Sequence, residues 1–304
     1  MFANKLYILC LIEKSEMEIK TLEGVDRKGI LKVFNDSFSD YFVPFKLTEE
    51  QLTSKMISDK IDLELSVGAF DNEKLIAFIL HGFDIINNQK VAYNGGTGVI
   101  PEKRGSGLTK QMYSFILPLL AEKGINRIIL EVIDKNIQAI KSYEKSGFKT
   151  KRELVCYKGD FNAIKINEEI KVKKLQKYQW ELMESFWDIR PTWQNSNKVM
   201  NKLKHNNISL GAYVKNELVG YIIYNPVNKR IQQIATGKDF RKKGVASTLI
   251  SELTKKYGNT FSVINVDKKS KSASKFFNSI GFENYLEQLE MEIKINNNYY
   301  EYCV

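Results

Sequence analysis

Hydrophobic and polar residues alternate along this chain with two different periods, and the order of those periods predicts its elements. Alternation at every second residue, or a short apolar run, is typical of a β-strand, whereas apolar residues spaced three and four apart are typical of a helix. In the first half these patterns predict strands at residues 17–22, 65–70, 75–84, 90–99, 128–132 and 149–157, and helices at residues 26–38, 48–58, 136–146 and after residue 107.

The second half of the chain repeats this order of elements. Strands are predicted at residues 169–175, 209–214, 218–224, 230–235, 261–266 and 286–295, and helices at residues 177–187, 197–204, 270–280 and after residue 244. Short turns make most strand pairs antiparallel, while the strand–helix–strand unit of each half requires one parallel pair. The predicted fold class is therefore α/β, with two tandem domains, each a mixed, mostly antiparallel sheet flanked by helices. The predicted boundaries are 17–161 and 168–304.

Two local patterns refine the first half. Thr48 and Gln51 have the spacing of a capping box, which predicts the start of a helix at this point. The helix after residue 107 is predicted to bury one side, formed by Leu108, Met112, Phe115, Ile116 and Leu119.

Each half carries a similar loop between a strand and a helix. The first loop reads Arg104-Gly105-Ser106-Gly107-Leu108-Thr109, and the second reads Arg241-Lys242-Lys243-Gly244-Val245-Ala246. In both halves a strand follows, and then a helix that ends in a Gly-Phe pair, Gly147-Phe148 and Gly281-Phe282. A repeated unit with this order of elements indicates two similar domains in tandem.

The composition of the loops is suited to a phosphate-bearing ligand. A helix N-terminus offers unpaired backbone N–H groups and the positive end of the helix dipole, and both attract anions. Gly105 and Gly107 let the backbone approach a pyrophosphate closely, and Arg104 or Lys243 adds positive charge. A plain helix start without any ligand remains the structural alternative.

The charge of the whole chain agrees with an anionic ligand without identifying one. The 304 residues carry a formal net charge of +10 and a pI of about 9.2. This balance favours a nucleotide cofactor, RNA or an acidic peptide, although a soluble basic surface would have the same value. No run of consecutive basic residues resembles a nucleic-acid-binding tail.

The cysteine and histidine counts exclude several kinds of site. Cys10, Cys156 and Cys303 lack metal-ligand spacing and are too few for a disulfide framework, which predicts a reducing, cytoplasmic setting. With only His81 and His205, a zinc site or a Ser-His-Asp triad has little support, and no metal is expected. Both histidines are predicted to be structural.

The first sixteen residues are predicted to be an N-terminal extension without a function of its own. Their apolar run is far shorter than the roughly 20 residues of a membrane span. No small-residue cleavage site follows it, as a signal peptide would require. No membrane partner is expected.

The repeated motifs resemble those of the GCN5-related N-acetyltransferases (GNAT). That family's pyrophosphate loop follows R/Q-x-x-G-x-G/A, which the second loop matches fully, while the first has Thr109 at the last small position. Further residues are similar to the family's next strand and helix: Leu130-Glu131-Val132, Asn136, Ala139, Tyr143 and Gly147-Phe148. The second copy has Asn265, Ser270 and Phe277 where the first has Glu131, Asn136 and Tyr143.

This resemblance implies that acetyl-CoA is the co-substrate and that it contacts both loops and the strands beside them. In the first copy the implied contacts are Val99, Ile100, Arg104, Gly105, Ser106, Gly107, Leu108, Thr109 and Asn136. In the second copy they are Ala235, Thr236, Arg241, Lys242, Lys243, Gly244, Val245 and Ala246.

The resemblance also implies two catalytic residues in the first copy. Tyr143 would be the acid that protonates the departing thiolate, and Glu131 would be the base that accepts a proton from the amine. The structural alternatives are a packed helix residue for Tyr143 and a solvated strand-end charge for Glu131. Phe277 of the second copy cannot donate a proton, so catalysis is expected in the first copy.

The function predicted is acetyl transfer to an amine on a small molecule or a peptide, by a monomer or a homodimer. A tandem acyltransferase that uses aminoacyl-tRNA is one alternative, although a nucleic-acid partner is not expected. A CoA-binding regulatory protein without catalysis is another. All three tryptophans gather before the second copy's third strand, and domain packing is favoured over an acceptor pocket for Trp180, Trp187 and Trp193, as for Tyr41, Phe42 and Phe45.

Overall fold

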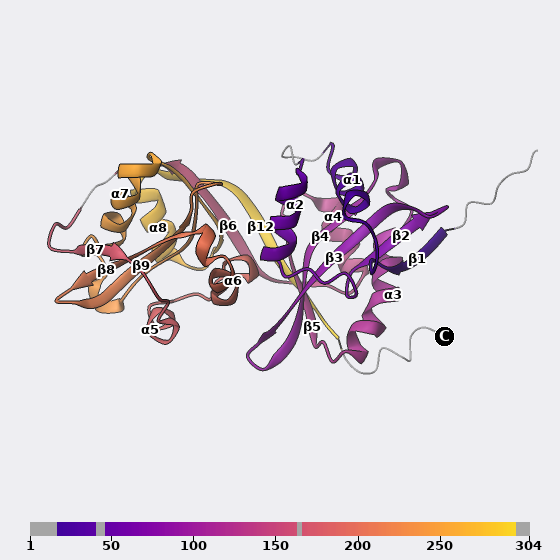
Figure 1. Cartoon of the computed structure of the whole chain (residues 1–304), viewed down its shortest axis with the longest axis horizontal. Coiled ribbons are helices and arrows are strands. Elements are labelled where there is room, and N and C mark those ends of the chain that lie inside the picture. The colour runs from indigo at the N-terminus through magenta and orange to yellow at the C-terminus, as the bar shows by residue number, and fades with distance from the viewer. Residues whose placement is uncertain (1–16, 41–45, 163–165, 296–304) are drawn as a thin grey trace, which may run out of the picture.

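One continuous sheet of twelve strands runs through the computed structural model, which describes residues 17–40, 46–162 and 166–295. Figure 1 shows helices on both sides of this sheet and two lobes joined by long strands. Across the sheet the strands follow the order β1-β2-β3-β4-β5-β12-β6-β11-β10-β9-β8-β7.

The elements of the first half follow the predicted order. Its strands are β1 (Met17–Thr21), β2 (Val67–Asp71), β3 (Lys74–Ile86), β4 (Gln89–Val99), β5 (Arg127–Ile133) and β6 (Lys149–Asp160). Its helices are α1 (Arg27–Ser37), α2 (Glu49–Ser58), α3 (Leu108–Glu122) and α4 (Ile137–Lys145), with a short 3₁₀ helix, η1 (Pro101–Lys103), before the loop.

The second half repeats the order with shorter helices before its second strand. Its strands are β7 (Lys171–Lys174), β8 (Ile208–Val214), β9 (Glu217–Asn225), β10 (Arg230–Thr236), β11 (Thr260–Asp267) and β12 (Phe282–Lys294). Its helices are α5 (Trp180–Ser185), α6 (Asn197–Lys202), α7 (Val245–Tyr257) and α8 (Lys271–Ser279), and its 3₁₀ helices are η2 (Trp193–Asn195), η3 (Lys204–Asn206) and η4 (Lys238–Phe240).

The strand pairing confirms the predicted mixed and mostly antiparallel sheet. β4 and β5 are parallel, pairing Val91–Tyr93 with Arg127–Ile129. β10 and β11 are parallel too, and their register contains the single pair Arg230 and Ser262. All the other strand pairs are antiparallel.

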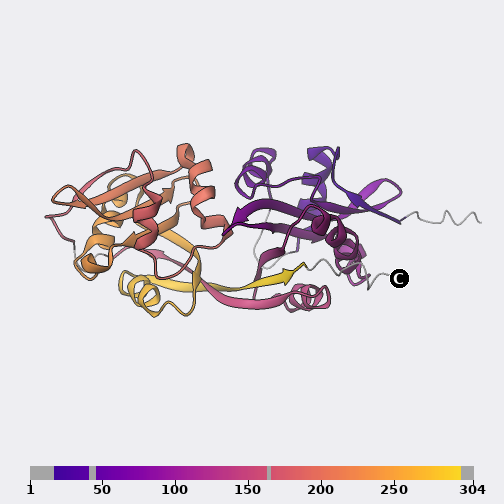
Figure 2. The same cartoon turned by 90° about the horizontal axis from the view of Figure 1, so that it is seen from below.

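The last strand of each half is exchanged between the halves, which the sequence did not predict. β6 leaves the first half and pairs with β11 of the second, while β12 returns to pair with β5 of the first. β6 and β12 also pair with each other, from Phe282 opposite Gly159 to Glu292 opposite Lys149. Figure 2 shows these two strands crossing together between the lobes. In space, each lobe therefore contains one strand from the other half of the sequence.

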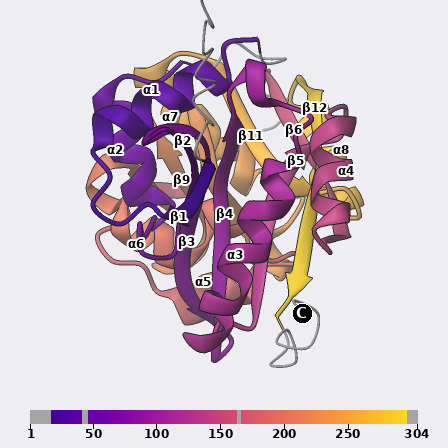
Figure 3. The same ribbon diagram turned by 90° about the vertical axis from the view of Figure 1, so that its right-hand side faces the viewer.

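Helices cover both faces of the sheet in each lobe, as Figure 3 shows for the first. On one face of the first lobe, α1 and α2 bury Ile30, Phe34 and Leu52 against Phe78 of β3. On the opposite face, α3 and α4 bury their own core residues against β2–β5. Thr48 and Gln51 form the predicted capping box at the start of α2.

One expectation about a side chain changes in the structure, and another falls outside the described residues. Phe115 of α3 is 36% exposed, so its predicted place on the core face is wrong. The helix turns by about 100° per residue, and its buried side is centred on Met112, Tyr113 and Ile116, which leaves Phe115 at the rim. Tyr41, Phe42 and Phe45 lie outside the described residues.

Two further points concern membrane-spanning helices and the buried histidine His81. Among the described residues, no helix has both the length and the apolar character needed to cross a membrane. His81 is fully buried in β3, and its Nδ1 lies 2.7 Å from the carbonyl oxygen of Leu65, consistent with the predicted structural role.

Candidate active site between the strands

The two loops have the same backbone conformation. Gly107 and Gly244 precede α3 and α7 with φ of 79° and 85°. Two residues earlier, Gly105 has φ of 77° and Lys242 has φ of 59°, so the second loop places a lysine where glycine is favoured. No side chain caps the start of either helix. The first N–H groups of both helices are therefore available to an anion.

Arg104 ties the first loop to the end of α1. Its two terminal nitrogens each lie 2.7 Å from an oxygen of Asp40, and one of them also donates to the carbonyl of Ser37 at 3.0 Å. Its Nε donates to the carbonyl of Val99 at 3.3 Å. The guanidinium thus binds protein groups on all sides, so its role here is to position the loop. Its contact with a cofactor stays a prediction.

Arg241 makes the same set of contacts in the second copy. It donates to Asp188 at 2.7 Å, to the carbonyl of Phe186 at 2.9 Å and to the carbonyl of Thr236 at 3.4 Å. The family motif begins with this arginine in both copies, so the resemblance implied that the arginine contacts the cofactor. In the structure the arginine of each copy ties its loop to the protein, and its contact with a cofactor stays a prediction.

The other loop residues divide into anchors and exposed groups. Leu108 and Val245 are buried and fix the first turns of their helices to the core. Ser106 donates to the carbonyl of Lys103, and Lys243 lies over the ring of Phe240. Gly105, Thr109, Lys242 and Ala246 are half-buried or exposed, and all these predicted cofactor contacts remain predictions.

A gap between β4 and β5 opens beside the first loop. The two strands pair only as far as Tyr93 and Ile129, after which β5 continues against β12 and β4 continues against β3. Val99 and Ile100 follow on β4 and lead into the loop. Between β10 and β11 the parallel pairing ends after one residue pair, and Ala235 and Thr236 occupy the matching place. Each gap thus ends at an uncapped helix start.

Glu131 lies on β5 just beyond the last pair with β4. Its Oε2 accepts a hydrogen bond of 2.6 Å from the hydroxyl of Tyr93. Burial raises the pKa of Glu131 to about 8, although the Tyr93 hydrogen bond opposes the shift. The charges of Glu290 and Asp59 raise it further. With this pKa the ionised carboxylate is a stronger base than an ordinary glutamate, and it becomes the main form only above a pH of about 8.

The second half supplies the wall beside Glu131. The ring of Trp193, from η2, stacks on Tyr93 with centroids 5.1 Å apart and planes 9° apart. Trp193 is 3% exposed, and its indole donates to the carbonyl of Asp59 at 3.3 Å. Trp193 is therefore part of the packing between the halves. This is the role that was predicted for it in preference to an acceptor pocket. Through Tyr93 it also positions Glu131.

The strand exchange adds charged groups next to Glu131. Glu290 of β12 is directly opposite Glu131, and Arg152 of β6 is directly opposite Glu290. Arg152 donates to Glu290 at 2.8 Å and lies 3.7 Å from Asp267 of β11. The environment of Glu131 thus contains residues from both halves of the chain.

Tyr143 approaches the same gap from the opposite face of the sheet. It is 8% exposed, and it packs with Leu130 and Val132, the neighbours of Glu131 whose side chains face α3 and α4. Burial raises the pKa of Tyr113, and the proximity of Tyr143 raises it further, while the Tyr113 hydroxyl accepts a hydrogen bond from Asn94 at 2.8 Å. Asn94 is the first residue of β4 beyond the pairing with β5. Glu131 therefore lies on one face of the sheet at this gap, while Tyr143 belongs to the core on the other face, near Tyr113.

The second copy differs at each of these positions. Asn265 interrupts the pairing of β11 with β6 at a φ of 60°, and its amide donates to Thr192 at 3.4 Å. Phe277 is buried against Tyr157 and Phe282. Arg230 lies at the end of the parallel pairing, where the first copy has Tyr93.

Asn136 has a local role that its prediction as a cofactor contact did not include. Its side-chain oxygen accepts from the N–H of Ala139 at 3.1 Å and so caps α4. Ser270 caps α8 in the same way. Both caps fix the start of the helix that carries Tyr143 or Phe277, a role typical of Asn and Ser.

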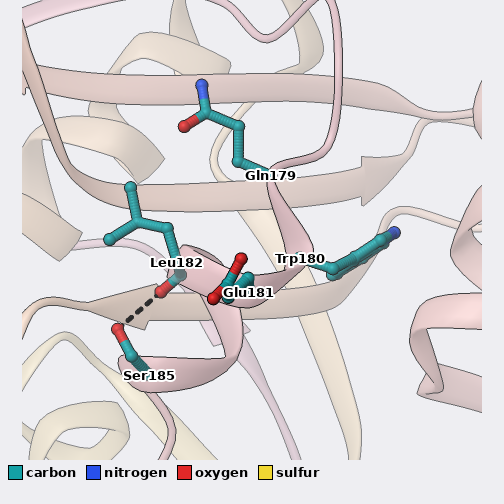
Figure 4. Close-up of a pocket in the computed structure, with 5 residues that line it drawn as sticks. All are labelled: Gln179, Trp180, Glu181, Leu182 and Ser185. Carbon is teal, nitrogen blue, oxygen red and sulfur yellow. Dashed lines mark hydrogen bonds between the residues drawn. The ribbon is translucent and has the colours of Figure 1, made fainter.

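A shallow hollow of about 620 Å³ lies elsewhere, around α5. Figure 4 shows its lining residues, Gln179, Trp180, Glu181, Leu182 and Ser185, grouped on one short helix. None of the predicted site residues borders it. A single exposed helix turn offers few converging groups, so the gap beside Glu131 remains the candidate site.

Several residues of the site were missed by the sequence analysis. Tyr93, Glu290 and Arg152 carry no motif, and their positions depend on strand register and on the exchange. Trp193 was noted only for its place among the tryptophans. The sequence contained one usable signal. Alternation within β5 turns Glu131 away from the face that carries the apolar side chains of Leu130 and Val132.

Comparison with known proteins agrees with this arrangement. The model of the acetyltransferase (GNAT) family matches residues 30–148, and that of an acetyltransferase (GNAT) domain matches residues 174–293. None of the curated proteins matches the chain significantly.

Solved structures with the same fold cover nearly the whole chain. A GCN5-related N-acetyltransferase from Sphaerobacter thermophilus is 14% identical, with a TM-score of 0.70 over 92% of this chain and 96% of its own. A tandem GNAT protein from the clavulanic acid biosynthesis pathway is 10% identical, with a TM-score of 0.68 over 93% of this chain and 100% of its own. A GCN5-related N-acetyltransferase from Anabaena variabilis is 14% identical, with a TM-score of 0.56 over 92% and 73%. These likenesses show a shared fold.

Proposed function

Because the chain belongs to the GNAT acetyltransferase family, with one copy of the domain in each half, we propose that it is an N-acetyltransferase that uses acetyl-CoA and is catalytic in its first copy. The observation that supports this most is Glu131, a carboxyl group with a pKa of about 8 at the mouth of the gap between β4 and β5. The acceptor is an amine on a small molecule or a peptide, and the location is cytoplasmic.

The residues around the gap fit a CoA thioester. An uncapped helix start with glycine at its N-cap is suited to a pyrophosphate, and a Cβ on Gly107 would have no neighbour closer than 3.9 Å. When bound, acetyl-CoA supplies an activated acyl thioester. The chain itself supplies the orientation of the loop through Arg104 and Asp40 and the unpaired edge of β4.

Proton transfer in this proposal is divided between the two faces of the sheet. Glu131 accepts a proton from the acceptor nitrogen at its Oε1, because Oε2 is occupied by Tyr93. Tyr143 holds a phenolic proton on the other side of the gap, where a departing thiolate would need one. The base and the acid then act without competing for the same proton.

The second copy is proposed to bind without catalysing transfer. Phe277 has no proton to donate, and Asn265 replaces a base with an amide. Its loop keeps the same backbone conformation as the first, so the capacity to bind CoA is retained.

The turnover rate should rise with pH up to a pH of about 8. Glu131 must be ionised to act as a base, and its raised pKa leaves only about a tenth of it ionised one pH unit below that value. We expect kcat/KM to increase about tenfold from pH 6 to pH 7 and to level off above pH 8. The measurement is release of CoA thiol with an amine panel, using an acceptor whose own pKa is far from 8. A flat profile over this range would argue against Glu131 as the base.

Substitution of the loop glycines should distinguish CoA binding by the first copy from CoA binding by the second. Gly107→Val should remove CoA binding to the first copy, and Gly244→Val should remove it from the second. A valine at these φ values is strained, and its side chain lies at the helix start. Isothermal titration with CoA should lose one site in each variant, and only Gly107→Val should abolish turnover.

Two matched variants control for backbone strain. Gly124→Val and Gly258→Val introduce the same residue at φ of 74° and 78°, at the far ends of α3 and α7. Both should bind CoA as the unmodified chain does. Unchanged stoichiometry in Gly107→Val and Gly244→Val would show that these loops do not bind the pyrophosphate.

A further inference from the structure

Arg230, the first residue of β10, is a cation whose guanidinium has no bonded partner among the described residues. It is half-buried, and its Nε is buried without a hydrogen-bond acceptor among the described residues. Within the described residues its guanidinium takes part in no ion pair or side-chain hydrogen bond, and only its backbone N–H donates, to Asn228. Its nearest charged or ionisable neighbours are Tyr285, Cys156 and Asp59, which act on it only at a distance. An arginine is normally paired when it is this enclosed.

The strand register places Arg230 in a row with a second cation. Arg230 pairs with Ser262 of β11, Ser262 with Lys158 of β6, and Lys158 with Glu283 of β12. Side chains of directly paired residues share a face of a sheet, and two strand spacings amount to about 10 Å. The guanidinium of Arg230 therefore extends over the same surface as Lys158.

A hollow of about 450 Å³ opens on this surface. It is lined by Lys158, Gly159, Asp160, Thr260, Glu283, Asn284 and Tyr285. Tyr285 belongs to the hollow and is also a close neighbour of Arg230, whose charge lowers the pKa of the tyrosine against the effect of burial. Arg230 does not itself line the hollow, and Tyr285 is the residue that links the two.

The charges nearby indicate what kind of anion would fit. The guanidinium offers a planar pair of donors that matches a carboxylate or a phosphate. Asp160 and Glu283 line the same hollow, and Asp59 lies near Arg230. This mixed field suits a singly charged group better than a doubly charged phosphate.

We propose that Arg230 is the centre of a carboxylate-binding site, entered through the hollow at Tyr285, whose ligand is a small organic acid. Arg230 occupies the position that Tyr93 has beside the candidate base of the first copy. The second copy thus has a binding group where the first has a group that positions a base. The proposal does not rest on the proposed function, because carboxylate binding is measured without acetyl transfer.

The test is ligand-observed NMR and thermal denaturation of the full chain at constant ionic strength. The probes are valerate, its uncharged analogue valeramide, δ-aminovalerate and inorganic phosphate. Valerate or δ-aminovalerate should bind and raise the melting temperature by a few degrees, while valeramide should do neither. Arg230→Met should weaken carboxylate binding at least tenfold, and Arg230→Lys should weaken it less. Lys229→Met, which removes an exposed charge one residue away, should bind as the unmodified chain does.

Comparing the binding of valerate with that of δ-aminovalerate shows which kind of molecule supplies the carboxylate. Tighter binding of δ-aminovalerate than of valerate indicates an acceptor that carries both an amine and an acid. Equal binding indicates a separate acid ligand. Both results support the site, provided that Arg230→Met abolishes them.

Three results would overturn the assignment. Valeramide could bind as well as valerate, or phosphate could bind more tightly than either acid. Arg230→Met could also bind valerate as Lys229→Met does. Stability gives an independent reading, since removing an enclosed, unpaired charge should leave the ligand-free melting temperature equal or higher. A melting temperature of Arg230→Met well below that of Lys229→Met would make Arg230 a structural residue instead.

Discussion

Tyr143→Phe should lower kcat by about 10²–10⁴-fold, the range typical of losing a general acid. The ring of Tyr143 packs 5.7 Å from that of Phe148 inside the first core, and phenylalanine keeps this contact. CoA affinity should therefore remain close to that of the unmodified chain. The measurements are steady-state release of CoA thiol and isothermal titration with CoA on the same preparation.

The matching position of the second copy provides the control. Phe277→Tyr adds a hydroxyl where the structure has Asn265 in place of a base, so turnover should change little. If Tyr143→Phe is silent while Gly244→Val abolishes turnover, catalysis belongs to the second copy.

Glu131→Gln should also reduce kcat/KM by about 10²–10⁴-fold above pH 8, where the carboxylate is ionised. Glutamine can still accept the hydrogen bond from Tyr93, so the local structure should persist. The variant should lose the rise in rate that the pKa of about 8 produces. A pH–rate profile of the variant next to the unmodified chain is the measurement.

Glu290→Gln is the paired control on the strand opposite. Its charge raises the pKa of Glu131, so removing it should lower that pKa and move the rise in rate to lower pH. The rate at pH 8 and above should stay within a few-fold of the original. Equal losses in Glu131→Gln and Glu290→Gln would mean that neither residue acts alone as the base.

Periodicity and turn chemistry were sufficient to predict the order of the elements. The capping box of Thr48 and Gln51 and the glycine before α3 and α7 depend only on neighbouring residues, and such local signals are readable from sequence. The two parallel pairs followed from the strand–helix–strand order. The family follows from the same local motifs.

The strand exchange could not be predicted in this way. Pairing β12 with β5 joins residues such as Glu290 and Glu131, which are far apart in the sequence. Either half could have kept its own last strand with the same pattern of alternation, because register depends on which partner is available. The surroundings of Glu131 were missed for this reason.

Arg104 and Arg241 show a second reason why the sequence alone does not give the surroundings of a site residue. Arg104 is the first residue of a phosphate-loop motif, and its charge suggested a direct ligand. Its position depends on Asp40 at the end of α1, a contact between distant residues that no local pattern contains. The same is true of Arg241 and Asp188.

The path of β12 makes the completion of the first lobe depend on an element that follows all the other described helices and strands. A ribosome releases residues 282–294 only after the whole second half has emerged, so β5 waits without its partner until then. A premature stop before residue 282 would thus expose an edge of the first lobe and remove Glu290 from beside Glu131. The tandem chain is in this sense a two-fold assembly with its subunits fused, and neither half is complete by itself.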